Sequence, residues 1–353
     1  MRGGRALPRD LAVRDGATAV DQIVTLADVV EARNRIRTEV VRTPLVSPEA
    51  LGKRVGVRVA LKLENFQRTG AFKFRGALNC VLKLLDARPG TDLRLVTASS
   101  GNHALGISLA GRIAGAKVTV VMPEGAPLVK QKKAREYGAE VLLHGQAYDD
   151  AQVRARRLAE ETGAVYIPSF NHPDIMAGQG TIALEVLEDL PEPQVLVFPI
   201  GGGGLAAGVA VACKALAPRT VLVGVQAEGA ASTRASLAQG KPVELSSLHT
   251  VADGIAVRRP GDLTFAVVKE LVDDVVTVSD EEILGAMRIL ITEASLVPEP
   301  AGAAAVAALL AGKVEIGEGG WAVAVVTGGN VDARLLHRVL QDSAGGSDSA
   351  SGC

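Results

Sequence analysis

Lys73 is the residue whose type and neighbours most strongly suggest chemistry: it stands between Phe72 and Phe74 in RTGAFKFRGA, residues 68–77. Most lysines lie at the surface with the ammonium group in water. One interpretation is a strand, in which alternation directs the phenylalanines to the core and the lysine to solvent. The other is a buried amine, because burial and neighbouring cations lower the pKa of a lysine and create a nucleophile near neutral pH. This segment alone favours the strand.

Four consecutive glycines, Gly201 to Gly204, lie between an apolar run and an alanine-rich run in FPIGGGGLAAG, residues 198–208. Because glycine has no Cβ, such a turn between a strand and a helix lets backbone N–H groups surround a phosphate. The segment lacks the Lys-Ser/Thr pair of a P-loop, and Ala207 stands where GxGxxG needs its third glycine. We therefore expect a phosphate-binding loop that serves neither ATP nor NAD.

Two further segments join a strand pattern to polar residues: TASSGNHALGI, residues 97–107, and VVTGGNVD, residues 325–332. The N–H groups at the helix start in the first segment can hold a carboxylate, although an ordinary Ser/Asn cap explains them equally well. The second segment alone is weak evidence. Together, a lysine, a phosphate loop, a carboxylate site and a strand-end hydroxyl suit pyridoxal phosphate, which needs a lysine for its aldehyde and a cradle for its phosphate.

These loops need a sheet to hold them. Short valine-rich runs without polar alternation predict strands buried on both faces, as in parallel sheets covered by helices. Helical patterns lie between several of these runs, and Thr25 with Asp28 and Ser279 with Glu282 predict helix starts. The fold class is therefore α/β and doubly wound, with two open, twisted, mostly parallel sheets flanked by helices. The predicted strands are 57–64, 93–99, 117–123, 139–145, 164–169, 194–200, 220–228, 273–279 and 321–329.

The composition excludes several classes of function. The chain has 353 residues, 48% of them hydrophobic, and a net charge of −1, which gives no support for nucleic acid or an anionic membrane as a partner. The three cysteines, Cys80, Cys213 and Cys353, are far apart, which argues against a disulfide framework or structural zinc and fits a reducing cytoplasm. No run reaches the roughly 20 apolar residues of a membrane span, and the start of the chain has no signal-peptide pattern. We expect a soluble, cytoplasmic protein.

From about Leu26 to Asp332 the chain resembles the fold-type II pyridoxal-phosphate enzymes, in the threonine/serine dehydratase and serine racemase branch. This resemblance reverses the interpretation of Lys73. It also implies a large cofactor domain, residues 25–76 and 168–340, a small domain, residues 77–167, a flexible arm, residues 1–24, and a disordered tail, residues 341–353. The motifs that carry it are LENFQRTGAFKFRGA, SSGNHA, AGQGTIALE, GGGGL, VADGIAV, EPAGA and TGGN.

The resemblance implies that Lys73 holds pyridoxal 5'-phosphate through its aldehyde and removes the proton from the substrate Cα, while Phe72 packs against the cofactor ring. Ser100 would be the second catalytic residue, protonating the opposite face of Cα in a racemase. The phosphate would bind the amides of Gly201, Gly202, Gly203, Gly204 and Leu205. The substrate carboxylate and Cα would be surrounded by Ser99, Ser100, Gly101, Asn102 and His103.

Four more residues are assigned to the cofactor ring by the same resemblance. Asn102 would bond the ring hydroxyl, and Thr327 would face the pyridine nitrogen. Gly254 would lie near the other ring face, and Glu299 near the cofactor's edge. A hydroxyl at Thr327 does not stabilise a protonated ring as a carboxylate does, which favours prompt elimination.

The chain departs from the family pattern at two places. Ala71 replaces a serine that often precedes the phenylalanine, which leaves the lysine segment intact. Relatives that bind a divalent cation have an acidic run after AE; here Glu228 is present, but Arg234 stands where a carboxylate is wanted. We therefore predict no metal. The remaining histidines lack metal-ligand spacing and are interpreted as structural or surface residues: His144, His172, His249 and His337.

The implied activity is that of an L-threonine and L-serine ammonia-lyase, which forms 2-oxobutanoate and ammonia from threonine. Two alternatives stay open: a serine racemase or dehydratase of another β-hydroxy amino acid, and a non-catalytic protein that binds a phosphate ligand. We expect an amino-acid substrate and a homodimer or homotetramer. After Asn330 only 23 residues remain, so we expect no isoleucine-sensing domain, because a folded domain needs about 50 residues. DARLLHRVLQ predicts one docking helix with Leu335, Leu336, Val339 and Leu340 on its apolar face.

Overall fold

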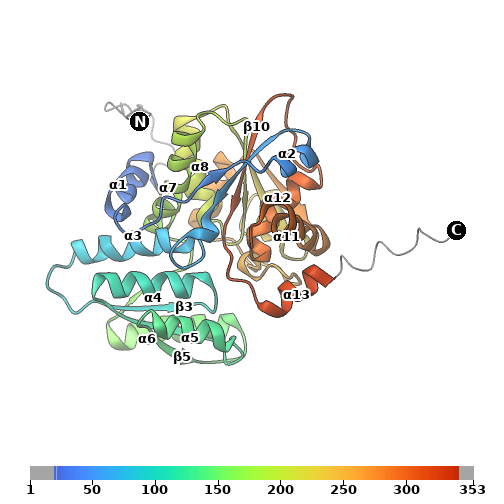
Figure 1. The fold of residues 1–353 in the computed structure, drawn as a ribbon. Coiled ribbons are helices and arrows are strands. Elements are labelled where there is room, and N and C mark those ends of the chain that lie inside the picture. Colours follow the sequence, from blue (N-terminus) through green and yellow to red (C-terminus); the bar gives the residue numbers. More distant parts are fainter. Residues whose placement is uncertain (1–19, 21, 342–353) are drawn as a thin grey trace.

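The structure is a computed structural model that describes residue 20 and residues 22–341. Most of the predicted arm, residues 1–24, and all but the first residue of the predicted tail, residues 341–353, therefore lie outside the described residues. Two sheets form the frame of the molecule, and Figure 1 shows the smaller one with its helices beside the larger one. The predicted fold class, two open and mostly parallel sheets flanked by helices, is confirmed.

The larger sheet has the strand order β1-β2-β10-β7-β8-β9. All neighbouring strands are parallel except β1, which pairs antiparallel with β2 through Leu45 opposite Lys62. Because the strands are parallel, the loops after β7 and β10 leave the sheet at the same edge. Its strands are β1 (Leu45–Val46), β2 (Arg58–Leu63), β7 (Val195–Pro199), β8 (Val221–Ala227), β9 (Asp274–Val278) and β10 (Trp321–Val326).

The smaller sheet is entirely parallel, in the order β5-β4-β3-β6. The strand at its centre, β3, leads directly into the loop at Ser99 and Ser100. Its strands are β3 (Arg94–Ala98), β4 (Lys117–Met122), β5 (Glu140–Leu143) and β6 (Val165–Tyr166).

Helices cover both faces of each sheet. On the larger sheet, α2, α11, α12 and α13 share a buried core with one face, and α1, α7, α8 and α10 with the other. On the smaller sheet, α3, α4 and α5 share one core, and α6 covers the opposite face. The helices are α1 (Leu26–Ile36), α2 (Glu49–Val55), α3 (Lys73–Asp86), α4 (Asn102–Ala114), α5 (Leu128–Glu136), α6 (Tyr148–Thr162), α7 (Pro173–Asp189), α8 (Gly204–Leu216), α9 (Ser232–Gln239), α10 (Asp262–Leu271), α11 (Asp280–Ala294), α12 (Pro300–Leu310) and α13 (Ala333–Gln341), with short 3₁₀ turns η1 (Glu64–Phe66), η2 (Glu228–Ala230) and η3 (Asp253–Ile255).

Each predicted strand is present, and both capping boxes are formed, at Thr25 with Asp28 and at Ser279 with Glu282. The two-residue strand β1 was not predicted, because so short a run carries no pattern. The domain boundaries at residues 76/77 and 167/168 stay a prediction. No helix in the described part of the chain is long and apolar enough to span a membrane.

The predicted terminal helix is present as α13, with Val339 buried against the main core. Leu335 and Leu336 pack partly on that core, but Leu340 is 42% exposed. The prediction that Leu340 joins the docking face was therefore wrong. The apolar spacing predicted the helix, but it did not predict which of the apolar residues contact the core.

Candidate active site

Lys73 is the first residue of α3, so the strand interpretation of this segment is wrong. Its amine, Nζ, donates to the carbonyl oxygen of Ser169 at 3.2 Å and lies 5.1 Å from the centre of the Phe72 ring. Burial lowers the pKa of Lys73 to about 8, and only the charge of Glu299 opposes this effect. About a tenth of such an amine is unprotonated at pH 7, far more than for a lysine with the ordinary pKa of 10.5, and this neutral form is a nucleophile and a base.

The segment before Lys73 is tied to the end of β10. The backbone N–H of Phe72 donates to the carbonyl of Thr327 at 3.0 Å, and Ala71 forms an antiparallel bridge with Gly328. The hydroxyl of Thr327 donates to the carbonyl of Ala301 at 3.3 Å and is almost fully buried. The lysine and the third predicted loop therefore meet in one place.

The glycine loop adopts a conformation that side chains would prevent. A Cβ atom at Gly202 would lie 2.3 Å from the ring of Phe170, and Gly203 has a φ of +94°. The hydroxyl of Thr264 donates to the Gly202 carbonyl at 2.6 Å and so holds the turn from outside. Within the described residues, the backbone N–H groups of residues 201–205 have no hydrogen-bond partner. These unpaired donors stand at the start of α8, where the helix dipole also favours an anion.

The serine loop reaches the larger sheet through the side chain of Asn102. Its Nδ2 donates to Glu299 Oε1 at 2.6 Å, and its Oδ1 accepts from Asn330 Nδ2 at 2.9 Å. Within the loop, the N–H of Gly101 donates to Ser99 Oγ at 3.1 Å, whereas Ser100 Oγ has no partner among the described residues. Both atoms of the Asn102 amide are thus engaged by protein groups.

His103 is buried behind this loop, and neither ring nitrogen has a hydrogen-bond partner in the described part of the chain. Burial and the nearby Lys73 lower the pKa of His103 to about 3. The imidazole is therefore neutral at physiological pH. The neutral ring therefore supplies no positive charge that would attract a substrate carboxylate.

Glu299 lies at the centre of these contacts. Burial raises the pKa of its carboxyl to about 7, although the hydrogen bond from Asn102 opposes the shift. A Cβ atom at Gly328 would lie 2.4 Å from Glu299 Oε1, and one at Gly254 would lie 3.7 Å from the same oxygen. Gly254 in turn touches the glycine loop, since a Cβ at Gly201 would lie 3.3 Å from the Gly254 carbonyl. The predicted residues on six segments thus form one connected site.

Sequence reasoning missed the residues that link these segments. Ser169 accepts the bond from Lys73, Phe170 shapes the glycine loop, and Asn330 joins Asn102 to the carbonyl of Thr69 at 2.7 Å. Ser169 and Phe170 could have been found from their position shortly after β6, because ligands bind at the carboxyl edge of a parallel sheet. Asn330 belonged to a quoted motif but was given no role.

Glu228, the one carboxylate considered for a metal, has a lysine beside it, and Arg234 stands near the same strand end. Lys313 Nζ lies 3.8 Å from Glu228 Oε1, and Arg234 donates to Thr277 Oγ1 at 3.2 Å. A separate group, Cys80, His172 and Asp174, has ligand atoms within 4.8 Å of one another. There Lys83 donates to Asp174 at 2.6 Å, and Nδ1 of His172 caps α7, which gives that histidine a structural role.

A family model described as pyridoxal-phosphate dependent enzyme matches residues 36–328. The chain belongs to this family. An L-threonine ammonia-lyase from Thermotoga maritima is 44% identical over 318 residues, which cover 90% of this chain and 78% of that protein. The chain is similar to a solved structure of threonine deaminase isoform 2 from Solanum lycopersicum, with a TM-score of 0.86, 36% identity, and 96% and 93% of the two chains covered. Maize serine racemase gives a TM-score of 0.85 at 36% identity, over 91% and 98% of the two chains.

This pyridoxal-phosphate enzyme belongs to fold-type II, in the threonine dehydratase and serine racemase group. The residues present fit the cofactor. Lys73 offers an amine with a lowered pKa, and the glycine loop offers N–H groups that no protein acceptor among the described residues uses. A side chain at Gly202 would clash with the ring of Phe170 and displace the loop from this conformation. Lysine and phosphate cradle are the two groups that the cofactor requires.

Proposed function

We propose that this protein is an L-threonine ammonia-lyase that uses pyridoxal 5'-phosphate and Lys73 to convert threonine to 2-oxobutanoate and ammonia, with L-serine as a second substrate. The observation that carries the proposal is the enclosed amine of Lys73, which forms no ion pair with the described residues and is placed among a phosphate-type loop, a serine loop and Thr327. The relatives named above as threonine ammonia-lyase and threonine deaminase support the choice of reaction.

Each segment of the site has a separate role that follows from its position. When bound, pyridoxal phosphate supplies an aldehyde for the substrate amine and a ring that accepts the electrons left on the substrate Cα. The N–H groups of residues 201–205 would hold the phosphate, and Phe72 and Thr327 would border the ring. The backbone of Ser99 to His103 binds the substrate carboxylate at the start of α4, where the unpaired N–H groups of a helix favour an anion.

Lys73 moves the proton. Its amine would remove the proton from the substrate Cα, and the bond from Cβ to the hydroxyl group would break, with the hydroxyl taking up a proton and leaving as water. Loss of water from threonine, followed by addition of water to the carbon–nitrogen double bond, gives 2-oxobutanoate and ammonia, so that the atoms balance. A lysine with a pKa of about 8 carries out this transfer near neutral pH, because its protonated and neutral forms are both populated.

The test is product analysis. The cofactor-loaded protein is incubated with L-threonine, and 2-oxobutanoate and ammonia are measured over time. The proposal expects both products in equal amounts. Binding of the cofactor without either product would support the non-catalytic alternative and reject the proposal.

A serine racemase remains the second candidate, because Ser100 Oγ has no partner among the described residues and is available to a substrate. The likeness to maize serine racemase favours this alternative. Chiral chromatography after incubation with L-serine separates the two activities. D-serine forming faster than pyruvate would identify a racemase.

We also infer a cytoplasmic homodimer or homotetramer. The buried cysteines Cys80 and Cys213 are free thiols, which suits a reducing compartment. Light scattering of the purified protein measures its mass, and a monomer of 36.4 kDa would contradict the oligomer.

A further inference from the structure

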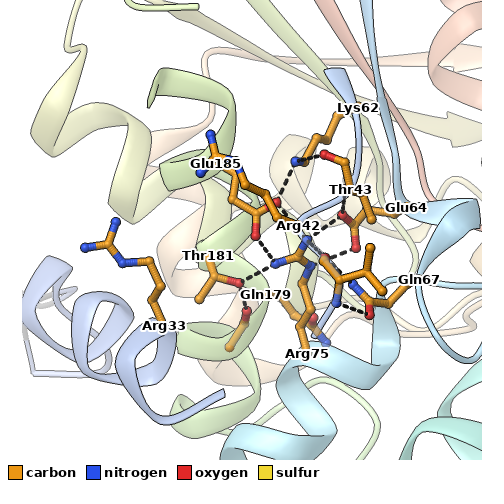
Figure 2. Close-up of polar contacts among 12 residues, drawn as sticks. Arg33, Arg42, Thr43, Lys62, Glu64, Gln67, Arg75, Gln179, Thr181 and Glu185 are labelled. Atoms are coloured by element: carbon orange, nitrogen blue, oxygen red, sulfur yellow. Dashed lines mark hydrogen bonds and ion pairs between the residues drawn. The ribbon is translucent and has the colours of Figure 1, made fainter. Parts of the chain in front are cut away.

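A buried cluster of four charged side chains lies behind the start of α3 (Figure 2). Lys62 and Arg75 supply two positive charges, and Glu64 and Glu185 supply two negative charges. Lys62, Arg75 and Glu64 are fully buried, and the side chain of Glu185 is 8% exposed. The cluster is therefore neutral as a whole and closed to solvent.

Arg75 is the centre of the cluster. Its Nε and Nη2 donate to the two oxygens of Glu64, both at 2.8 Å. Its Nη1 donates to Glu185 Oε1 at 2.6 Å, and Nη2 to Glu185 Oε2 at 2.9 Å. Thr181 and the carbonyl of Val41 accept two longer bonds of 3.2 Å. Every nitrogen of the guanidinium is thus fixed, and the fork can occupy only one orientation.

Lys62 and Thr43 complete the set. Lys62 Nζ donates to Glu185 at 2.5 Å and to the carbonyl of Thr43 at 2.7 Å, while the hydroxyl of Thr43 donates to Glu64 at 2.5 Å. The partners come from β2, η1 and α7, so the cluster joins three elements to α3. Burial works against the charge of Arg75, but Glu64 and Glu185 outweigh it and raise the pKa of the arginine.

Such a cluster is a poor source of stability, because desolvation of the ions offsets most of their attraction. What it supplies is a fixed geometry. Arg75 lies two residues after Lys73 in the first turn of α3, and two residues along a helix is a rotation of about 200°. Arg75 therefore anchors the side of the turn that faces away from the Lys73 side chain.

The turn is held on its other flank by backbone contacts. Phe72 N–H donates to Thr327, and Ala71 bridges Gly328. On the α7 side, Gly76 N–H donates to Gln179 Oε1 at 3.2 Å. The first turn of α3 is consequently fixed between the end of β10 and the buried cluster.

We propose that Arg75 is a positioning residue for Lys73: its bonds to Glu64 and Glu185 fix the first turn of α3 and so direct the Lys73 amine at the cofactor and substrate. The inference rests on the proposed function of Lys73. It assigns the cluster a role in the reaction rate, which an ion cluster that served only the fold would not have. Displacement of a reacting group by about 1 Å lowers a rate by about 100-fold.

The first test is Arg75→Lys, which keeps the positive charge but loses the fork. The rate constant kcat is expressed per bound cofactor, counted from its visible absorbance, so that unfolded molecules do not count. We expect kcat to fall about 30-fold with KM within about threefold, because the cluster touches neither the serine loop nor the glycine loop. The visible circular dichroism per bound cofactor should also change, since it reports cofactor orientation.

Arg42→Lys is the matched control. Arg42 also pairs with two carboxylates, Glu188 and Asp189, but its side chain is 49% exposed and lies on the surface side of α7. This variant should keep kcat within about 1.5-fold. An Arg75→Lys protein with a lower melting temperature but unchanged kcat and visible circular dichroism would overturn the inference.

If the Arg75→Lys protein does not fold, Glu64→Gln tests the positioning role of Arg75 instead. It keeps the shape of the side chain but presents an amide NH₂ to Arg75, which needs an acceptor there. We expect kcat per bound cofactor to fall at least about fivefold; an unchanged value would reject the positioning role. Lys73→Ala separates the two proposals: if that variant stays active, the proposed function of Lys73 fails, whereas an inactive Lys73→Ala with a fully active Glu64→Gln defeats only the inference about Arg75.

Discussion

Two enclosed lysines, Lys73 and Lys62, lie on opposite sides of the start of α3 and have different surroundings. Lys62 has a carboxylate at 2.5 Å and a carbonyl at 2.7 Å, and it is part of a neutral ion cluster. Among the described residues, the Lys73 amine bonds only the carbonyl of Ser169, at 3.2 Å. Burial lowers the pKa of both amines, but Glu185 and Glu64 oppose the effect at Lys62, whereas only the more distant charge of Glu299 opposes it at Lys73.

Burial alone therefore does not make a lysine reactive. A buried ammonium with a bonded carboxylate keeps its proton and joins elements of the fold. A buried amine without such a partner gives up its proton easily and can act as a nucleophile.

The largest expected effect is on activity. Lys73→Ala should lower kcat for threonine by at least about 1,000-fold, because it removes both the cofactor anchor and the base. The ammonia-release assay measures this, and circular dichroism should show an unchanged fold. A variant with more than a tenth of the wild-type rate would show that Lys73 is not the reactive amine.

The second-largest expected effect is a loss of folding stability when Lys62 is replaced. Lys62→Met should lower the free energy of unfolding by about 3–5 kcal/mol, since it leaves the buried carboxylate of Glu185 without one of its two cations. Urea unfolding measures the loss. Lys214→Met is the control: that lysine pairs with Asp273 at 2.6 Å near the surface, and its loss should cost about 1 kcal/mol or less. Equal losses of unfolding free energy in the two variants would contradict the prediction that the buried ion pair costs more to break than the exposed one.

A smaller effect of opposite sign is expected for Lys73→Met in the cofactor-free protein. The folded pKa of about 8 lies below the ordinary value of 10.5, so below pH 10.5 the unfolded chain binds more protons and the lysine destabilises the fold. The variant should therefore be more stable than the wild type at pH 7, by about 2 kcal/mol after allowance for partial exposure.

The pH dependence of the stability difference between Lys73→Met and the wild type tests the sign of this effect. Between pH 8 and 10.5 the wild type regains stability as pH rises, so the advantage of Lys73→Met should shrink and vanish near pH 10.5. Urea unfolding at pH 7, 8, 9 and 10 measures it. A variant that is less stable than the wild type at pH 7 would mean that the Lys73 ammonium is well accommodated.

The sequence predicted most of the frame, because its information there is local. Valine-rich runs such as residues 194–200 and 321–329 could be assigned as strands, and the pairs Thr25–Asp28 and Ser279–Glu282 marked helix starts three residues apart. The motif around Lys73 also predicted its chemistry, which stays a prediction. Its backbone was not: alternating Phe, Lys and Phe fits a strand, and packing of α3 against α7 and the smaller sheet makes it a helix start.

The rest depends on partners far apart in the chain. Arg75 meets Glu185 across 110 positions, and Asn102 meets Glu299 across 197. No local pattern distinguishes these residues from surface charges or caps, so neither the ion cluster nor the bond between Asn102 and Glu299 was predicted. Leu340 shows the same limit, since helical spacing did not reveal which apolar residue stays exposed.

The most direct test of the account asks which amine holds the cofactor. The protein is loaded with pyridoxal phosphate, reduced with borohydride to fix the carbon–nitrogen bond, digested, and mapped by mass spectrometry. We predict one modified site, Lys73, with Lys62 unmodified. A cofactor adduct on Lys62 or another lysine, with Lys73 free, would contradict it.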